Sequence, residues 1–136
     1  MCTNAISKSM TPTMWRWFFW TVFVIVWTAA LLTTEPVHVA QAVLAPPVIF
    51  PTSKLLHLSA YAVLAVLSGW LFVTAHWRWL LVVFMCFHAF GTEFFQQFVP
   101  ERGASLRDVG IDHIGIVVGL ALSSRWWLQI DKSGQQ

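Results

Sequence analysis

Long apolar stretches separated by short polar segments run through the whole chain. Four of them approach the roughly 20 residues that a helix needs to cross the hydrocarbon core of a bilayer, namely residues 15–32, 55–75, 79–98 and 109–127. Only residues 76–78 separate the second stretch from the third, which favours an antiparallel helical hairpin. The pattern predicts an all-α membrane protein in which residues 1–136 form one domain, a bundle of four transmembrane helices.

Residues 33–54, between the first two predicted helices, form the longest connection. Prolines interrupt it at positions 36, 46, 47 and 51, although the stretch VAQAVLAPPVIF within it is apolar. Proline lacks a backbone donor and disfavours continuous helix. We therefore expect a Pro-interrupted loop that lies in the headgroup region or folds over the bundle.

The composition agrees with a lipid bilayer as the main partner. Hydrophobic residues make up 57% of the 136 residues and charged residues only 10%, against about 25% charged residues in soluble domains. The net charge of +2 is too small to indicate nucleic acid. TTEP follows the first apolar stretch in place of a small-residue cleavage site, so we expect an uncleaved anchor.

Basic and aromatic residues indicate which helix ends face the cytoplasm. With the N-terminus inside, five of the eight Lys and Arg residues fall on inner segments, as expected for cytoplasmic loops. These five are Lys8, Arg16, Arg78, Arg125 and Lys132. Tryptophans at positions 15, 17, 20, 77, 79, 126 and 127 lie near the same ends and suit an interfacial belt. Both termini are therefore predicted to be cytoplasmic.

Polar residues gather at the opposite, outer ends of the predicted helices. Lys54, His57 and Tyr61 share one face of the second helix at spacings of three and four residues. Glu93 shares a face with Gln96 near the end of the third. The second and third predicted helices therefore bring polar side chains to one layer.

The fourth predicted helix adds two more carboxylates to this layer. Ser105 followed by Asp108 predicts a capping box with Asp in place of Glu. Asp112 lies one turn further on, at a depth similar to that of Glu93, and Arg102 is the nearest cation. Carboxylates inside a membrane are costly and are functional candidates by default. The site hypothesis has Glu93, His57 and Asp112 as catalytic candidates and Lys54, Tyr61, Gln96, Arg102, Ser105 and Asp108 as ligand-binding residues.

Gly115 and Gly119 form a GxxxG motif in the fourth predicted helix. Small residues at this spacing allow two helix backbones to approach closely. We interpret the motif as a packing contact within the bundle in preference to a dimerisation face.

These features together resemble the VanZ-like family of small bacterial membrane proteins over residues 54–119. The segments that carry the resemblance are KLLHLSAYAVL from Lys54, EFFQQFVPER from Glu93 and SLRDVGIDHIGIVVG from Ser105, together with the Pro-interrupted loop before them. Asp112 departs from the family pattern, where Asn is usual, and Glu101 stands where Gly is frequent. The resemblance implies a multi-pass protein of the bacterial cytoplasmic membrane. Because the family is named for a protein associated with teicoplanin resistance, a link to glycopeptide resistance is one expectation, but the resemblance implies no established reaction.

Several functions fit this pattern. The first is binding or modification of a lipid headgroup or cell-envelope precursor, with the basic residues of the site holding an anion. The second is an intramembrane enzyme with Glu93 or Asp112 as general base and His57 as its partner, or with a divalent ion held by Glu93, Asp108 and Asp112. A structural or partner protein is a third. An ion-coupled permease is disfavoured because the polar residues gather at one end of the helices.

The orientation predicts the reactivity of cysteines engineered into the 99–107 segment, in a background where Cys2 and Cys86 are replaced by Ser. A membrane-impermeant thiol reagent added to intact cells should label them, because this segment is predicted to lie outside. A cysteine at position 77 should be labelled only after the cytoplasmic side is opened. If the cysteine at position 77 were labelled in intact cells and those in the 99–107 segment were not, the topology would be the opposite of the predicted one.

Overall fold

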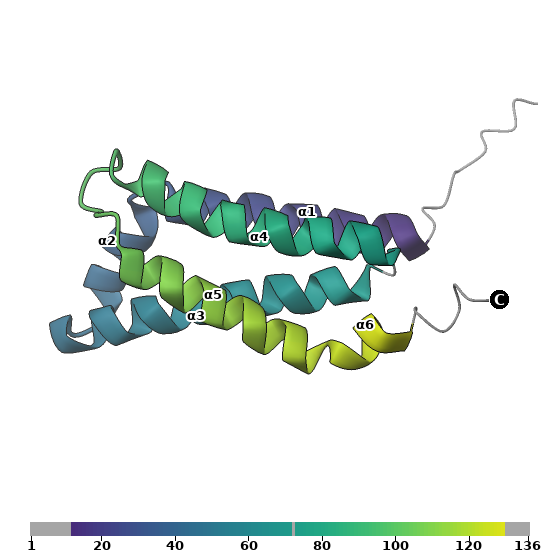
Figure 1. The fold of residues 1–136 in the computed structure, drawn as a ribbon. Helices are drawn as coiled ribbons and strands as arrows, with labels where there is room; N and C mark the ends of the chain where they lie inside the picture. The colour runs from purple at the N-terminus through teal and green to yellow at the C-terminus, as the bar shows by residue number, and fades with distance from the viewer. Residues whose placement is uncertain (1–11, 72, 130–136) are drawn as a thin grey trace, which may run out of the picture.

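The computed structural model describes residues 12–71 and 73–129, and all regular secondary structure in those ranges is helical. The helices are α1 (Pro12–Leu31), α2 (Glu35–Val43), α3 (Pro46–Trp70), α4 (Ala75–Gln96), α5 (Leu106–Leu122) and α6 (Ser124–Gln129). Four long helices lie alongside one another, with α2 at one end of the bundle and α6 at the other (Figure 1). The all-helical class predicted from the sequence is confirmed.

Three of these helices are long and apolar enough to cross a membrane: α1, α3 and α4, with apolar segments of 19, 25 and 21 residues. Helix α5 has 17 residues, which at about 1.5 Å each fall short of a hydrocarbon core of about 30 Å. A bend at Ser123 separates α5 from α6, where one continuous helix over 109–127 was predicted. The fourth span therefore stays a prediction.

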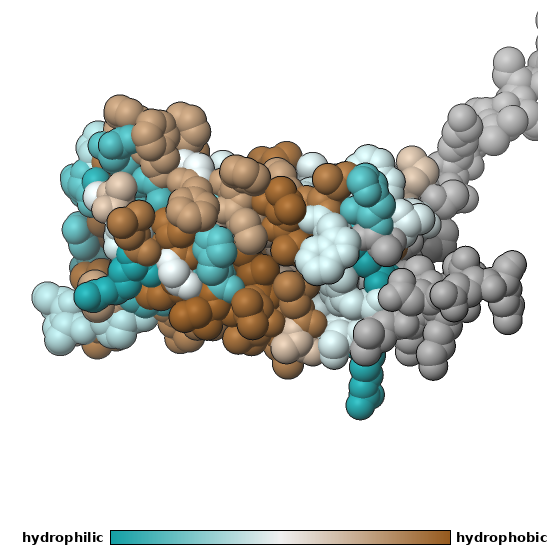
Figure 2. Space-filling view, viewed as in Figure 1, coloured by the Kyte–Doolittle hydropathy of each residue, from teal (hydrophilic) through white to brown (hydrophobic). Residues whose placement is uncertain are grey.

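The distribution of side chains suits a lipid environment. Large apolar side chains such as Phe87 and Val26 are exposed, whereas Glu93 and Asp112 are buried. One face of the molecule shows an apolar band between more polar ends (Figure 2). A soluble protein rarely exposes so much contiguous apolar surface, so the bundle is built to be solvated by lipid along its sides.

The connection predicted as a loop is largely helical, which corrects the sequence interpretation. Residues 35–43 form α2, and α3 begins at Pro46 rather than at residue 55. Proline is tolerated in the first turn of a helix, where its missing N–H has no intrahelical partner. Pro36 occupies that region of α2 and Pro46 begins α3, while Pro51 lies within α3. The prolines therefore mark helix starts as well as interruptions.

The hairpin between α3 and α4 is confirmed with shifted ends. Helix α3 stops at Trp70 and α4 begins at Ala75, so the predicted turn residues 76–78 belong to α4. The start of α1, this turn and α6 lie at the same end of the bundle (Figure 1), as the tryptophan positions predicted. Lys8 and Lys132, which contributed to the charge count, lie outside the described residues.

Helix α3 packs most extensively on α5, and the two run parallel. A Cβ atom added to Gly115 would overlap the carbonyl oxygen of Leu58, and one added to Gly119 would overlap that of Ala62. The two glycines therefore allow backbone-to-backbone contact, which confirms the interpretation of GxxxG as packing within the bundle.

Gly119→Ala and Gly110→Ala should have opposite effects on stability. Overpacking at Gly119 forces α3 away from α5 and should cost about 1–3 kcal/mol. Gly110 has open space around its Cβ position, so the alanine should gain up to about 1 kcal/mol of helix propensity. Thermal unfolding in detergent measures both. Equal melting temperatures for the two variants would show that α3 and α5 are not in close contact.

Candidate functional site

The outermost polar contact between α3 and α5 is an ion pair. The Nζ atom of Lys54 donates to both carboxylate oxygens of Asp108, at 2.5 and 2.7 Å. Asp108 is buried and Lys54 is half-buried. Lys54 is therefore neutralised within the bundle, and a ligand anion would have to compete with Asp108 for it.

This ion pair takes the place of the predicted capping box. Ser105 is the residue before α5, but its side chain makes no capping hydrogen bond, and Asp108 is held by Lys54. The backbone N–H of Ser105 instead donates to Oε2 of Glu93 at 2.8 Å. The end of α4 and the start of α5 are thereby joined through a buried carboxylate.

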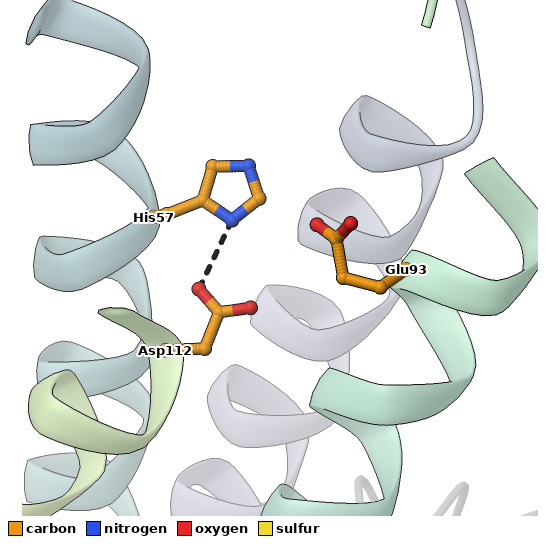
Figure 3. Close-up of side chains that lie close together, drawn as sticks. All are labelled: His57, Glu93 and Asp112. Atoms are coloured by element: carbon orange, nitrogen blue, oxygen red, sulfur yellow. Dashed lines mark hydrogen bonds and ion pairs between the residues drawn. The ribbon is translucent and has the colours of Figure 1, made fainter. Parts of the chain in front are cut away.

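One turn deeper, His57, Glu93 and Asp112 meet from three different helices. The Nδ1 atom of His57 lies 3.0 Å from Oδ1 of Asp112, and the three side chains point toward one another (Figure 3). One ligand-type atom from each lies within 4.8 Å of the other two. Asp112 is fully buried, and the exposed fractions of Glu93 and His57 are only 3% and 5%. The three catalytic candidates predicted from the sequence are therefore adjacent.

Several buried polar atoms have no hydrogen-bond partner among the residues that the structure describes. The acceptors are Oε1 of Glu93 and Oδ2 of Asp112, and the donors are Nε2 of Gln96, Nε of Arg102 and Nε1 of Trp27. Each such group forfeits a hydrogen bond, at a cost of about 1–3 kcal/mol or more for charged groups. Five such atoms indicate that water, an ion or a ligand satisfies them in the working protein.

Arg102 does not pair with the buried acids as expected. Its Nη2 donates to the carbonyl oxygen of Ala30, 2.9 Å away at the end of α1, and among the described residues no carboxylate forms an ion pair with it. Burial lowers the pKa of Arg102, and the charge of nearby Glu93 opposes that shift. The guanidinium therefore caps a carbonyl group at the C-terminal end of α1, where a positive charge is favoured.

An apolar groove of about 140 Å³ ends at the polar cluster. It lies between α1, α2 and α3 and is lined by Leu31, Val37, Ala40, Ile49 and Leu56, among others. His57, Arg102 and Trp27 also line it, and the rings of Trp27 and His57 meet edge to face at 5.8 Å between centroids. The groove thus combines apolar walls with two buried donors that have no partner.

Tyr61 serves a second polar connection. Its hydroxyl lies 2.9 Å from Nδ1 of His88 and 3.3 Å from the hydroxyl of Thr92, and His88 lies 2.8 Å from the hydroxyl of Thr28. This network joins α1, α3 and α4. His88 connects the hydroxyls of Thr28 and Tyr61. Thr28 and Trp27 are not predicted from the sequence, because no spacing within α1 indicates which of its faces is turned inward.

Glu101 is the one non-glycine residue of the described chain with a positive φ, 63°. That left-handed region favours glycine. The side chain of Glu101 lies 3.2 Å from the ring of His38, and both are exposed. This turn places Arg102 under the end of α1.

Comparison of the chain with protein-family models, curated proteins and solved structures finds no match. The resemblance to the VanZ-like family therefore rests on the residues quoted above.

A double-mutant cycle at Lys54 and Asp108 tests the outer ion pair. Lys54→Met should leave Asp108 buried without a cation and destabilise the protein by about 1–3 kcal/mol, less than the loss for a fully buried pair because Lys54 is partly exposed. Adding Asp108→Asn should recover part of that loss, which thermal unfolding of the four proteins would measure. Additive losses would show that the two side chains do not interact.

Proposed function

We propose that the chain binds the anionic headgroup of a membrane amphiphile, with its apolar chain in the groove between α1, α2 and α3. The observation that carries this proposal is the pair of unpartnered buried donors, Nε of Arg102 and Nε1 of Trp27, in residues that line an apolar groove. An acceptor such as a phosphate or carboxylate oxygen would satisfy both. The apolar walls suit an acyl or prenyl chain.

The neighbouring residues support an anion at this end of the groove. Lys54 and Asp108 neutralise each other, so Arg102 is the basic side chain that faces the groove. Its guanidinium is held by the end of α1 through Nη2, which orients it before the ligand arrives. A preorganised donor binds more tightly because less conformational entropy is lost on binding.

We propose the membrane location and the orientation of this site from the sequence. The headgroup end of the groove lies at the outer face of a bacterial cytoplasmic membrane, with four spans and both termini in the cytoplasm. A phospholipid headgroup and a phosphorylated cell-envelope precursor share the chemistry that the groove would recognise. A glycopeptide-resistance role, implied by the VanZ-like resemblance, would follow if the ligand were such a precursor.

Retention of phosphatidylglycerol against phosphatidylcholine, measured by native mass spectrometry of the purified full chain, tests the proposal. Arg102→Gln should weaken phosphatidylglycerol binding by about 1.5–3 kcal/mol, or roughly 10- to 100-fold, because a hydrogen bond to a charged group is lost. Trp27→Phe keeps the ring but removes the N–H, and should cost about 1 kcal/mol.

Arg107→Gln is the matched control, because Arg107 is exposed at the start of α5 and does not line the groove. It should leave retention unchanged. Equal retention by wild type and Arg102→Gln would contradict the proposal. If only Arg107→Gln lost binding, the headgroup would bind at the surface near Arg107 and not in the groove.

An acid–base enzyme is the second candidate, favoured by the position of His57. Its ring is held by Asp112 and also lines the groove, so it could act as a base toward a bound amphiphile. Incubation with phosphatidylglycerol followed by mass analysis of the recovered lipid separates the two candidates. An altered lipid that appears with wild type and not with His57→Asn would favour the enzyme.

A further inference from the structure

We infer that His57, Glu93 and Asp112 hold a divalent transition-metal ion, a site that goes beyond headgroup binding and does not depend on it. The three residues come from α3, α4 and α5 and point toward a common centre (Figure 3). They offer one imidazole nitrogen and two carboxylates. Three protein ligands with room for water or substrate are typical of catalytic zinc sites.

The first argument is the pair of buried acceptors without a partner. Glu93 uses Oε2 to accept from the backbone of Ser105, which leaves Oε1 unpartnered. Asp112 uses Oδ1 with His57, which leaves Oδ2 unpartnered. Both side chains are more than nine-tenths buried. A cation between them would satisfy both oxygens at once.

The second argument is charge. Lys54 is occupied by Asp108, and Arg102 bonds to a carbonyl of α1. Among the described residues no Lys or Arg forms an ion pair with Glu93 or Asp112, and His57 is a cationic partner of Asp112 only when its ring is protonated. A buried charge without compensation is strongly unfavourable. A divalent ion would supply the missing positive charge.

The third argument is distance and access. Ligands about 2.0–2.2 Å from a tetrahedral zinc ion lie roughly 3.3–3.6 Å from one another. In the structure Nδ1 of His57 and Oδ1 of Asp112 are hydrogen-bonded at 3.0 Å, and the ligand atoms of the three residues lie within 4.8 Å of one another. An ion that used both of these atoms would replace the proton between them and draw the three side chains closer. A hollow of about 280 Å³ between α4 and α5 is lined by Glu93 and Ser105 and offers a route for a hydrated ion.

The donor set indicates the class of ion. Mg²⁺ and Ca²⁺ prefer sites made entirely of oxygen, whereas imidazole suits metals such as Zn²⁺, Fe²⁺ and Ni²⁺. Asp108 was a candidate ligand on sequence grounds, but its ion pair with Lys54 removes it from the set. His57, which the sequence assigned to acid–base chemistry, takes its place.

The test titrates Zn²⁺, with Mg²⁺ for comparison, into metal-stripped full-length protein in detergent. Wild type should bind one Zn²⁺ per chain with a rise in melting temperature, because an ion that binds only the folded state stabilises it. Glu93→Gln and Asp112→Asn keep the side-chain shapes and should each weaken Zn²⁺ binding by more than about tenfold. Mg²⁺ should bind far more weakly.

His38→Ala is the matched control, because His38 and Glu101 form an exposed histidine–carboxylate pair at the same end of the bundle. It should leave Zn²⁺ binding unchanged. No saturable binding to wild type, or binding that both Glu93→Gln and Asp112→Asn retain in full, would overturn the inference. Loss of binding in His38→Ala would also overturn it, by moving the ion to the surface.

X-ray absorption of the Zn²⁺-loaded wild type keeps the inference testable if the variants fail to fold. Scattering from a single imidazole, with oxygen ligands completing the coordination, is expected. Sulfur in the first coordination sphere, or two or more imidazoles, would exclude this site.

Discussion

Two glycines of α5 touch backbone carbonyls of α3, and the geometry of the site depends on that contact. With Gly115 against Leu58 and Gly119 against Ala62, the parallel helices are held in one register. Asp108 then falls opposite Lys54, and Asp112 falls opposite His57. Both polar pairs follow from this register, since the three residues from Lys54 to His57 and the four from Asp108 to Asp112 each make about one helical turn.

The close contact also explains why the polar residues are tolerated inside a bundle with lipid-facing sides. Each of the three carboxylates has a partner from a neighbouring segment: Asp108 from Lys54, Asp112 from His57, and Glu93 from the backbone of Ser105. Most of the buried polar atoms that lack a hydrogen-bond partner fall into two groups, one of donors and one of acceptors. The donors of Trp27 and Arg102 belong to residues that line the groove, whereas the acceptors of Glu93 and Asp112 belong to the three-helix centre; Nε2 of Gln96 belongs to neither group. An anion and a cation would complete the two groups separately.

Local patterns were sufficient to predict much of this. Helical spacing correctly brought His57, Glu93 and Asp112 to one depth, and the spacing of Gly115 and Gly119 correctly predicted a contact within the bundle. Both depend on positions within single helices, which the sequence displays directly. The long apolar stretches likewise predicted the all-helical class.

The errors arose where a choice between partners depends on the three-dimensional arrangement. Asp108 looked like a helix cap, but a buried ion pair with Lys54 is available to it and satisfies both of its oxygens. Arg102 looked like the partner of the acids, but the end of α1 lies closer. The prolines predict a loop over α2 and the start of α3, because proline interrupts the interior of a helix. Proline is nevertheless compatible with the first turn of a helix.

The most direct measurement of this account is an experimental structure of the full chain in nanodiscs that contain phosphatidylglycerol and Zn²⁺. The account predicts headgroup density within hydrogen-bond distance of Arg102 and Trp27, and a separate metal peak between His57, Glu93 and Asp112. A groove filled by side chains, with Arg102 turned to the membrane surface and His57 apart from Asp112, would contradict it.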